Sequence, residues 1–226
     1  MTRWQAARLV EARDETPSAR TLVFDVPGWP GHLAGQHVDV RLTAEDGYTA
    51  RRSYSLAATQ GVELTVQRLE DGEVSPYLTQ IMEPDDRLEI RGPVGGWFVW
   101  RPEDPGPVLL VAGGAGIVPL MAMVRARRTA GVVTPFHLIY SLRSPEQLYY
   151  ADELREPDPG VEVSLVYTRV RDSRLTAADL PGPGPGPGPG CFVCGPTGFV
   201  EAAADLLVGL GHDPARIKTE RFGASS

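Results

Sequence analysis

Residues 51–57 read Arg51-Arg52-Ser53-Tyr54-Ser55-Leu56-Ala57, and the first half of the chain is organised around them. Apolar residues alternate before this stretch, at 38–42, and after it, at 62–66, which is typical of β-strands. On a strand, Arg52 and Tyr54 share one face, and Ser53 and Ser55 share the other. A guanidinium that forks onto phosphate, a flat ring and a short hydroxyl suit a flavin nucleotide. An ordinary strand with an exposed Arg and a packed Tyr fits the same residues.

The composition predicts a globular protein of up to two modest domains. The chain has 226 residues, 42% of them hydrophobic, and a net charge of −7, which argues against nucleic-acid binding through a broad basic face. Its two cysteines, Cys191 and Cys194, are too few for a tetrahedral zinc site or an iron–sulfur cluster, so we expect no metal. The chain shows neither a signal peptide nor a run of about 18 apolar residues, so we expect a cytoplasmic protein that binds no membrane.

The first hundred residues predict about six short strands separated by glycine turns, and therefore a closed antiparallel barrel. One helix start interrupts them. Ser75 suits an N-cap and Pro76 a first helical residue, and Gly72 lets a ligand approach the backbone closely. Free amides at this helix start would attract an anion. A capped connecting helix without a ligand is the alternative interpretation.

A charged, proline-rich segment at residues 101–107 marks the domain boundary, which we place between residues 102 and 103. Beyond it, apolar strand patterns alternate with helical ones, which predicts a parallel sheet. The continuous apolar run at 108–112 is typical of a strand that is buried on both faces. A glycine-rich turn and a helix follow, and small residues there would let a diphosphate approach the helix N-terminus. Pro119 stands at the last glycine position of the usual G-x-G-x-x-G spacing.

These motifs, in this order, resemble those of the ferredoxin–NADP reductase family. The matching stretches are Arg52-x-Tyr54-Ser55, Gly72-x-Val74-Ser75, residues 113–119, Cys194-Gly195-Pro196 and Glu220-x-Phe222-Gly223. The resemblance implies an N-terminal antiparallel Greek-key β-barrel for FAD, residues 1–102, and a C-terminal α/β parallel-sheet, Rossmann-like nucleotide domain, residues 103–226. Many members of the family carry a fused ferredoxin or haem domain, but this chain has too few cysteines and too few residues for either, so we expect it to stand alone, without a fused iron–sulfur domain.

The resemblance assigns a role to each of these residues. Arg52 would hold the flavin diphosphate together with Gly72, Val74 and Ser75. Tyr54 would pack on the isoalloxazine, and Ser55 would approach its N5 atom. The nicotinamide nucleotide would bind Gly114, Ala115, Gly116, Ile117 and Pro119, with Cys194, Gly195 and Pro196 beside the nicotinamide. Glu220 and Phe222 would lie near the flavin, so the expected catalytic residues are Tyr54, Ser55, Cys194 and Glu220.

The choice between related cofactors depends on fewer residues. FAD is favoured over FMN because the barrel offers an anion site at residues 72–75 in addition to Arg52. Arg143, Arg169 and Arg174 follow predicted strand ends, and Arg rather than an acidic residue is typical of a site for the NADP 2′-phosphate. We therefore expect these three arginines to bind NADPH in preference to NADH. Arg171 is expected to be a solvated loop charge.

The resemblance implies hydride transfer from NADPH or NADH to FAD, followed by electron transfer to a separate acceptor such as a ferredoxin or an oxygenase partner. We expect the reductase itself to be a monomer. One alternative is an NAD(P)H:flavin reductase that releases its reduced flavin. Another is a non-catalytic, nucleotide-binding electron-relay subunit.

Three further features carry structural expectations only. Trp97 and Phe98 are expected to face the core or the domain interface. The Pro-Gly alternation at residues 181–190 is expected to be a surface loop. Cys191 is expected to be a buried strand residue that forms no disulfide with Cys194.

Overall fold

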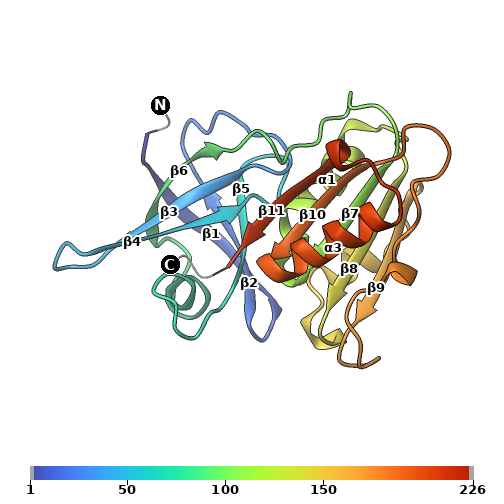
Figure 1. Cartoon of the computed structure of the whole chain (residues 1–226). Coiled ribbons are helices and arrows are strands. Elements are labelled where there is room, and N and C mark those ends of the chain that lie inside the picture. Colours follow the sequence, from blue (N-terminus) through green and yellow to red (C-terminus); the bar gives the residue numbers. More distant parts are fainter. Residues whose placement is uncertain (1–2, 224–226) are drawn as a thin grey trace.

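The computed structural model describes residues 3–223, which form an antiparallel sheet and a parallel sheet that lie side by side (Figure 1). The antiparallel sheet has the strand order β4-β3-β6-β1-β2-β5. Its strands are β1 (Gln5–Thr16), β2 (Ala19–Asp25), β3 (His37–Thr43), β4 (Thr49–Ser55), β5 (Val62–Gln67) and β6 (Arg87–Val94). This sheet is the expected N-terminal domain.

Alternating side chains of these strands form the core of the barrel. Leu22, Val38, Val40, Leu64 and Val66 are at most 1% exposed and belong to one apolar cluster. Because successive strand residues point to opposite faces, the alternation in the sequence curls the sheet around its apolar side.

The barrel is not closed by a continuous ladder, so that part of our expectation was wrong. Its edge strands, β4 and β5, meet through a single bridge between Leu56 and Leu64. One further backbone hydrogen bond joins the same two segments, from Ala57 N to Glu63 O at 2.8 Å. Within residues 3–223, no strand pairs with the edge of β4 that faces away from β3.

The expected N-cap at Ser75 was also wrong. The helical segment between β5 and β6 is a single π-helical turn, Tyr77–Ile81, with Pro76 in the cap position. The Ser75 hydroxyl instead accepts a hydrogen bond from the backbone N of Leu69 at 3.0 Å. The Ser75 side chain therefore closes the loop of residues 69–75 and does not cap the helix.

The parallel sheet has the strand order β11-β10-β7-β8-β9, and all of its neighbouring strands run parallel. Its strands are β7 (Val108–Gly113), β8 (Phe136–Leu142), β9 (Val161–Tyr167), β10 (Gly190–Pro196) and β11 (Ile217–Phe222). Its helices are α1 (Ile117–Ala130), α2 (Ala151–Arg155) and α3 (Thr197–Gly209). The expected α/β parallel-sheet domain is confirmed.

Strand β7 is buried on both faces, as its apolar run predicted. Leu110 and Ala112 pack in the cluster that contains α1, whereas Leu109 and Val111 pack in the cluster that contains α3. The chain order along the sheet reverses between β7 and β10, because β8 lies on one side of β7 and β10 on the other. Ligands of such sheets bind beyond the carboxyl ends of the strands at this reversal.

The two aromatic residues after β6 differ in position. Phe98 is buried between the domains and packs edge-to-face on Phe192, with 5.5 Å between ring centroids. Trp97 is 66% exposed and does not face the core. It lies at the domain interface instead, because its ring is 5.9 Å from Lys218 Nζ on β11.

The Pro-Gly segment is a surface loop that leads into the amino end of β10, as expected. Residues 184–187 are exposed. Both ends of the loop are anchored: Pro181 O contacts His212 Nε2 at 2.9 Å, and Pro189 O accepts from Arg216 Nε at 3.3 Å. Cys191 is buried in β10 with a free thiol, and Cys194 is also free.

Among residues 3–223, the structure contains no helix with the length and apolar character needed to cross a membrane.

Candidate functional site

The two domains touch where β4 and β11 end. The Ser55 hydroxyl donates to Glu220 Oε1 at 3.3 Å. Ser55 is the last residue of β4, and Glu220 lies in the second half of β11. Two expected catalytic residues, 165 positions apart in the chain, therefore lie within hydrogen-bond reach of each other.

The register of the parallel sheet adds Cys194 to this group. Cys194 on β10 lies opposite Glu220 on β11 and opposite Ala112 on β7. Two positions further on, Pro196 lies opposite Phe222. The sheet thus brings these expected site residues together at the carboxyl ends of β10 and β11.

Burial favours the neutral forms of the titratable groups of this site. Burial raises the pKa of Glu220 to about 7, and the hydrogen bond from Ser55 only partly opposes that rise. Burial, together with the neighbouring Glu220 carboxylate, raises the pKa of the Cys194 thiol well above its usual value. Cys194 is fully buried and is therefore not a reactive thiolate.

Tyr54 lies one residue before Ser55 and opposite Val38 of β3, where it packs on the barrel core. Burial raises the pKa of its phenol, which stays protonated at neutral pH. The side chain is half-buried, so part of it remains available to a ligand.

The glycine-rich turn after β7 touches the end of β10. A Cβ added to Gly116 would lie 2.0 Å from the carbonyl oxygen of Cys194, so only glycine permits this approach. Gly114 has a left-handed φ of +54°, and no atom lies within 4 Å of the position of its absent Cβ. The turn therefore presents open backbone at the N-terminus of α1. Ile117 and Pro119 are buried in that helix, so they can offer a nucleotide only their backbone.

Gly113 and Gly195, both within motifs that we assigned to the nucleotide, also shape the site through Phe199, which we did not assign to it. A Cβ on Gly113 or on Gly195 would lie within 2.7 Å of the Phe199 ring, which packs across the ends of β7 and β10. The signal in the sequence is the phenylalanine that closely follows Cys194-Gly195-Pro196. These small residues let the strand ends and α3 approach one another.

Arg52 lies beside the loop that was expected to share its ligand. Arg52 Nη2 is 3.8 Å from Glu73 Oε2, and the Tyr48 hydroxyl donates to the other oxygen of Glu73 at 2.7 Å. Gly72 has no room for a side chain, because a Cβ there would lie 2.9 Å from Ser75 Oγ. Val74 is fully buried. The guanidinium is half-exposed and the loop is tightly closed, which fits a cradle for a diphosphate.

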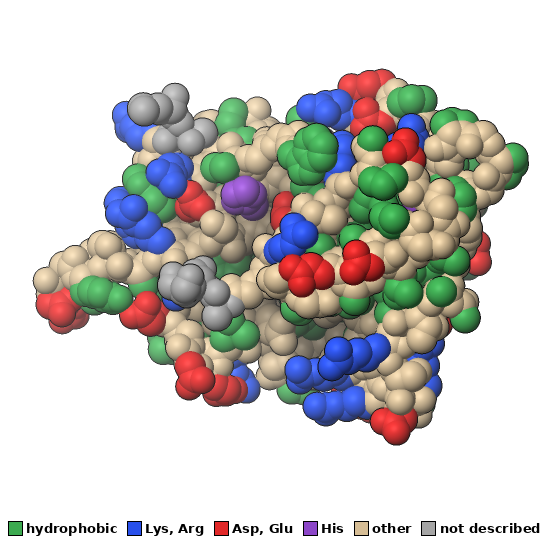
Figure 2. All heavy atoms as spheres, viewed as in Figure 1, with side chains coloured by type: hydrophobic (Ala, Val, Ile, Leu, Met, Phe, Trp, Pro, Cys, Tyr) green, Lys and Arg blue, Asp and Glu red, His purple; other side chains and the backbone are tan. Residues whose placement is uncertain are grey.

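Three of the expected arginines have side chains free for a ligand. The side chains of Arg143, Arg169 and Arg174 are exposed and form no hydrogen bond or ion pair with any residue that the structure describes. Arg169 N donates to Arg143 O at 3.0 Å, so the loops after β8 and β9 lie side by side. Figure 2 shows Lys and Arg side chains grouped below α3, at the edge where these strands end. Arg171 instead pairs with Asp179.

Comparisons with known proteins identify two domains in the chain. Residues 6–99 match the family model described as an oxidoreductase FAD-binding domain, and residues 110–205 match that of an oxidoreductase NAD-binding domain. The chain is 31% identical over 239 residues to a ferredoxin–NADP reductase B of Sorangium cellulosum, with 96% of each chain covered. It is 29% identical over 238 residues to a glycine betaine monooxygenase reductase subunit of Chromohalobacter salexigens. That match covers 96% of this chain but only 64% of the relative, so the chain spans a little under two thirds of the relative's length.

Solved structures show the same fold. The FAD/NAD-binding domain of a nitric oxide dioxygenase from Vibrio cholerae superposes with a TM-score of 0.80 at 23% identity, covering 97% of this chain and 99% of that one. A cytochrome P450 reductase from Amycolatopsis gives a TM-score of 0.79 at 26% identity, covering 98% and 70% respectively.

Proposed function

Because the chain belongs to the ferredoxin–NADP reductase family, we propose that it passes electrons from NADPH or NADH through FAD to a separate acceptor protein. The chain is an FAD-dependent NAD(P)H oxidoreductase with an FAD-binding and an NAD-binding domain. Our proposal names the residues that hold each cofactor. It also names the preferred nucleotide and the class of acceptor. The two functional domains are residues 1–102 and 103–226.

The contact between Ser55 and Glu220 carries the proposal. It joins Ser55, the last residue of the Arg52-x-Tyr54-Ser55 motif, to β11, the strand that pairs with β10 at Cys194. Bound FAD supplies the chemistry, accepting hydride from the reduced nicotinamide and passing the electrons on. Ser55 positions the reactive edge of the ring, and the neutral phenol of Tyr54 packs against it. Cys194, whose thiol is neutral and fully buried, holds the end of β10 beside the proposed place of the nicotinamide.

Glu220 is suited to handling a proton at this site. Its pKa of about 7 lets its carboxyl exist in both protonation states near neutral pH. The hydrogen bond from Ser55 fixes one carboxyl oxygen, so a proton would be held or released at the other. Phe222, two residues further along β11, is half-buried and packs against the apolar cluster that contains Cys194.

Each domain contributes one diphosphate cradle. In the barrel, Arg52 faces the closed loop of Gly72, Val74 and Ser75, which supports a role in holding the FAD diphosphate. In the nucleotide domain, the open backbone at Gly114 and the N-terminus of α1 support the same role for the nicotinamide nucleotide. Exposed Arg143, Arg169 and Arg174 favour the 2′-phosphate of NADPH.

The acceptor that we propose is a ferredoxin or an oxygenase component. The relative in Chromohalobacter salexigens is the reductase subunit of a monooxygenase, and another, in Pseudomonas putida, is the electron transfer component of a dioxygenase. The Sorangium cellulosum relative, which this chain matches almost end to end, is a ferredoxin–NADP reductase. We propose that the protein works as a monomer that meets its acceptor transiently.

A spectroscopic titration tests the proposal. The purified protein should show a flavin spectrum that persists through gel filtration, and anaerobic NADPH should bleach it at lower concentration than NADH. Loss of the yellow colour on the column would favour the flavin reductase that releases its product. A protein that keeps its flavin but is bleached by neither nucleotide would contradict the proposed function.

A further inference from the structure

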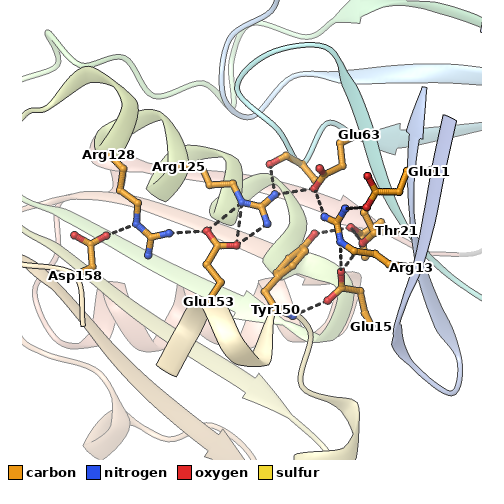
Figure 3. Close-up of polar contacts among 12 residues, drawn as sticks. Glu11, Arg13, Glu15, Thr21, Glu63, Arg125, Arg128, Tyr150, Glu153 and Asp158 are labelled. Atoms are coloured by element: carbon orange, nitrogen blue, oxygen red, sulfur yellow. Dashed lines mark hydrogen bonds and ion pairs between the residues drawn. The ribbon is translucent and has the colours of Figure 1, made fainter. Parts of the chain in front are cut away.

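A second group of contacts joins the domains through elements other than β4 and β11. We call it the interdomain cluster; it consists of Glu15, Glu63 and Thr65 of the barrel and Arg125, Tyr150 and Glu153 of the nucleotide domain. The barrel residues lie on β1 and β5, and the others lie on α1 and at the start of α2. Figure 3 shows the side chains of Glu15, Glu63, Arg125, Tyr150 and Glu153 converging between the two domains.

Arg125 is the residue through which most of these contacts pass. Its Nη1 donates to Glu63 Oε1 and to the backbone oxygen of Ala57, each at 2.9 Å. Its Nη2 donates to Glu153 Oε2 at 2.6 Å. The side chain is only 18% exposed, and its guanidinium lies 4.7 Å from the centre of the Tyr150 ring. A planar cation with five donors therefore bridges both domains at once.

Tyr150 ties the nucleotide domain to the barrel at two more points. Its backbone N donates to Glu15 Oε2 at 2.9 Å, and its hydroxyl donates to Thr65 Oγ1 at 2.6 Å. Its φ of 56° is left-handed, a strained backbone for a residue with a side chain. A buried residue keeps such a backbone only where its surroundings hold it. Two of the bonds that hold it come from the other domain, and a third, from Leu154 N to the Tyr150 carbonyl oxygen, comes from its own helix.

The place of these contacts gives the cluster a function. The domains also meet at the Ser55–Glu220 hydrogen bond and where Phe98 packs on Phe192, both on the side of β10 and β11. The cluster fastens the barrel to α1 and α2 instead, so it restricts rotation of the domains about those contacts. Hydride transfer needs the reacting atoms about 3–3.5 Å apart, and a displacement of about 1 Å slows such reactions by roughly 100-fold. The alignment of the two cofactor sites therefore depends on contacts that touch neither cofactor.

We propose that the interdomain cluster sets the alignment of the flavin and nicotinamide sites, and that Arg125 is its principal positioning residue. The inference rests on the proposed function, because the alignment matters for hydride transfer between the two domains. It concerns how the domains are held, not which residues bind the cofactors.

Arg128 on the same helix provides a matched control. It donates to Glu153 at 2.5 Å and to Asp158, both in the nucleotide domain. Arg125→Met and Arg128→Met therefore each remove one cation and its bonds to Glu153, but only the first removes a contact with the barrel. Neither change leaves an acid without a partner: in Arg125→Met, Glu63 keeps Arg13 at 3.0 Å and Glu153 keeps Arg128.

The first measurement is amide hydrogen exchange of the full chain with FAD bound and no nucleotide. Arg125→Met should speed exchange in residues 57–65 of the barrel and in residues 150–155 of the nucleotide domain, whereas Arg128→Met should leave 57–65 unchanged. Tyr150→Phe should also speed exchange in residues 57–65, by a smaller factor than Arg125→Met, whereas its control Tyr149→Phe should leave exchange there unchanged.

The second measurement is anaerobic stopped-flow reduction of the bound flavin at saturating nucleotide. Arg125→Met should slow reduction by about tenfold or more and change the nucleotide Kd by less than about twofold. Equal effects of the two arginine variants, or wild-type exchange and reduction in Arg125→Met, would overturn the proposal. A wild-type protein that no nucleotide reduces would instead contradict the proposed function, and the exchange comparison would still decide whether the cluster holds the domains together.

Discussion

Gly116 and Cys194 are in backbone contact: a Cβ on Gly116 would lie 2.0 Å from the Cys194 carbonyl oxygen and 2.4 Å from its carbonyl carbon. The turn that precedes α1 and the end of β10 are therefore packed together as closely as a peptide backbone allows. Both belong to the expected nucleotide site, so the geometry of that site depends on this one glycine.

Gly116→Ala should lower the free energy of unfolding by about 2 kcal/mol, because the methyl group must displace backbone. Nucleotide binding should weaken with it. Gly209→Ala is the control, since no atom lies within 4 Å of a Cβ there and alanine suits a helix better than glycine. Urea denaturation and nucleotide titration of both variants check the prediction. Unchanged stability of Gly116→Ala would mean that the turn and β10 are not in contact in solution.

The raised pKa of Glu220 predicts a pH dependence of stability. The folded protein holds this proton up to pH of about 7, whereas the unfolded chain releases it near its ordinary pKa of about 4.5. The folded state thus binds more protons between these values, and its stabilisation, at most about 3 kcal/mol, is present below pH 4.5 and lost as the pH rises through 7.

Glu220→Gln should abolish this part of the pH dependence. The measurement is urea denaturation of the flavin-free protein at intervals from pH 5 to pH 8, compared between wild type and variant. Parallel curves for the two proteins would show that Glu220 titrates normally. Ser55→Ala should keep the pH dependence and raise the pKa further, because the hydrogen bond that opposes the shift is removed.

Arg52→Ala should weaken FAD binding by about tenfold or more, the usual value of hydrogen bonds to a charged group. Arg51→Ala is the matched control, because this neighbouring arginine points to the other face of β4, where it lies 5.5 Å from the ring of Trp4. Fluorescence titration of the flavin-free proteins with FAD measures both affinities. Similar losses in the two variants would indicate a general effect of charge, not a diphosphate contact at Arg52.

Arg143→Ala and Arg169→Ala should raise the KM for NADPH by about tenfold and the KM for NADH by less than about twofold, since only NADPH carries the 2′-phosphate. Arg171 lies in the same loop as Arg169 but is already paired with Asp179, so Arg171→Ala should leave the ratio of the two KM values unchanged. Steady-state reduction of ferricyanide with each nucleotide supplies the values. A proportional rise for both nucleotides would remove the reason for expecting NADPH.

The sequence predicted those parts of the fold that depend on local periodicity. Alternation identified the barrel strands around Tyr54, and a continuous apolar run identified β7 as the buried strand of a parallel sheet. It did not predict the bridge between Leu56 and Leu64 or the hydrogen bond from Leu69 N to the Ser75 hydroxyl. Both depend on which of several possible partners lies within reach once the chain has folded.

The interdomain cluster had no signal in the sequence for a similar reason. Glu15 and Tyr150 are 135 residues apart, and Glu63 and Arg125 are 62 apart. Each residue, taken alone, is typical of a solvated surface. Only the packing of α1 and α2 against the barrel brings them together.

Strand β10 joins the Pro-Gly loop at its amino end to Cys194-Gly195-Pro196 at its carboxyl end. A strand of this length spans about 20 Å, and the loop is fastened at Pro181 and Pro189, with its exposed middle free between them. Gain or loss of Pro-Gly units would therefore change only the length of the exposed segment between these two anchored residues. A chain with more or fewer Pro-Gly units would keep the register of β10 with β7 and β11 at the far end of the strand.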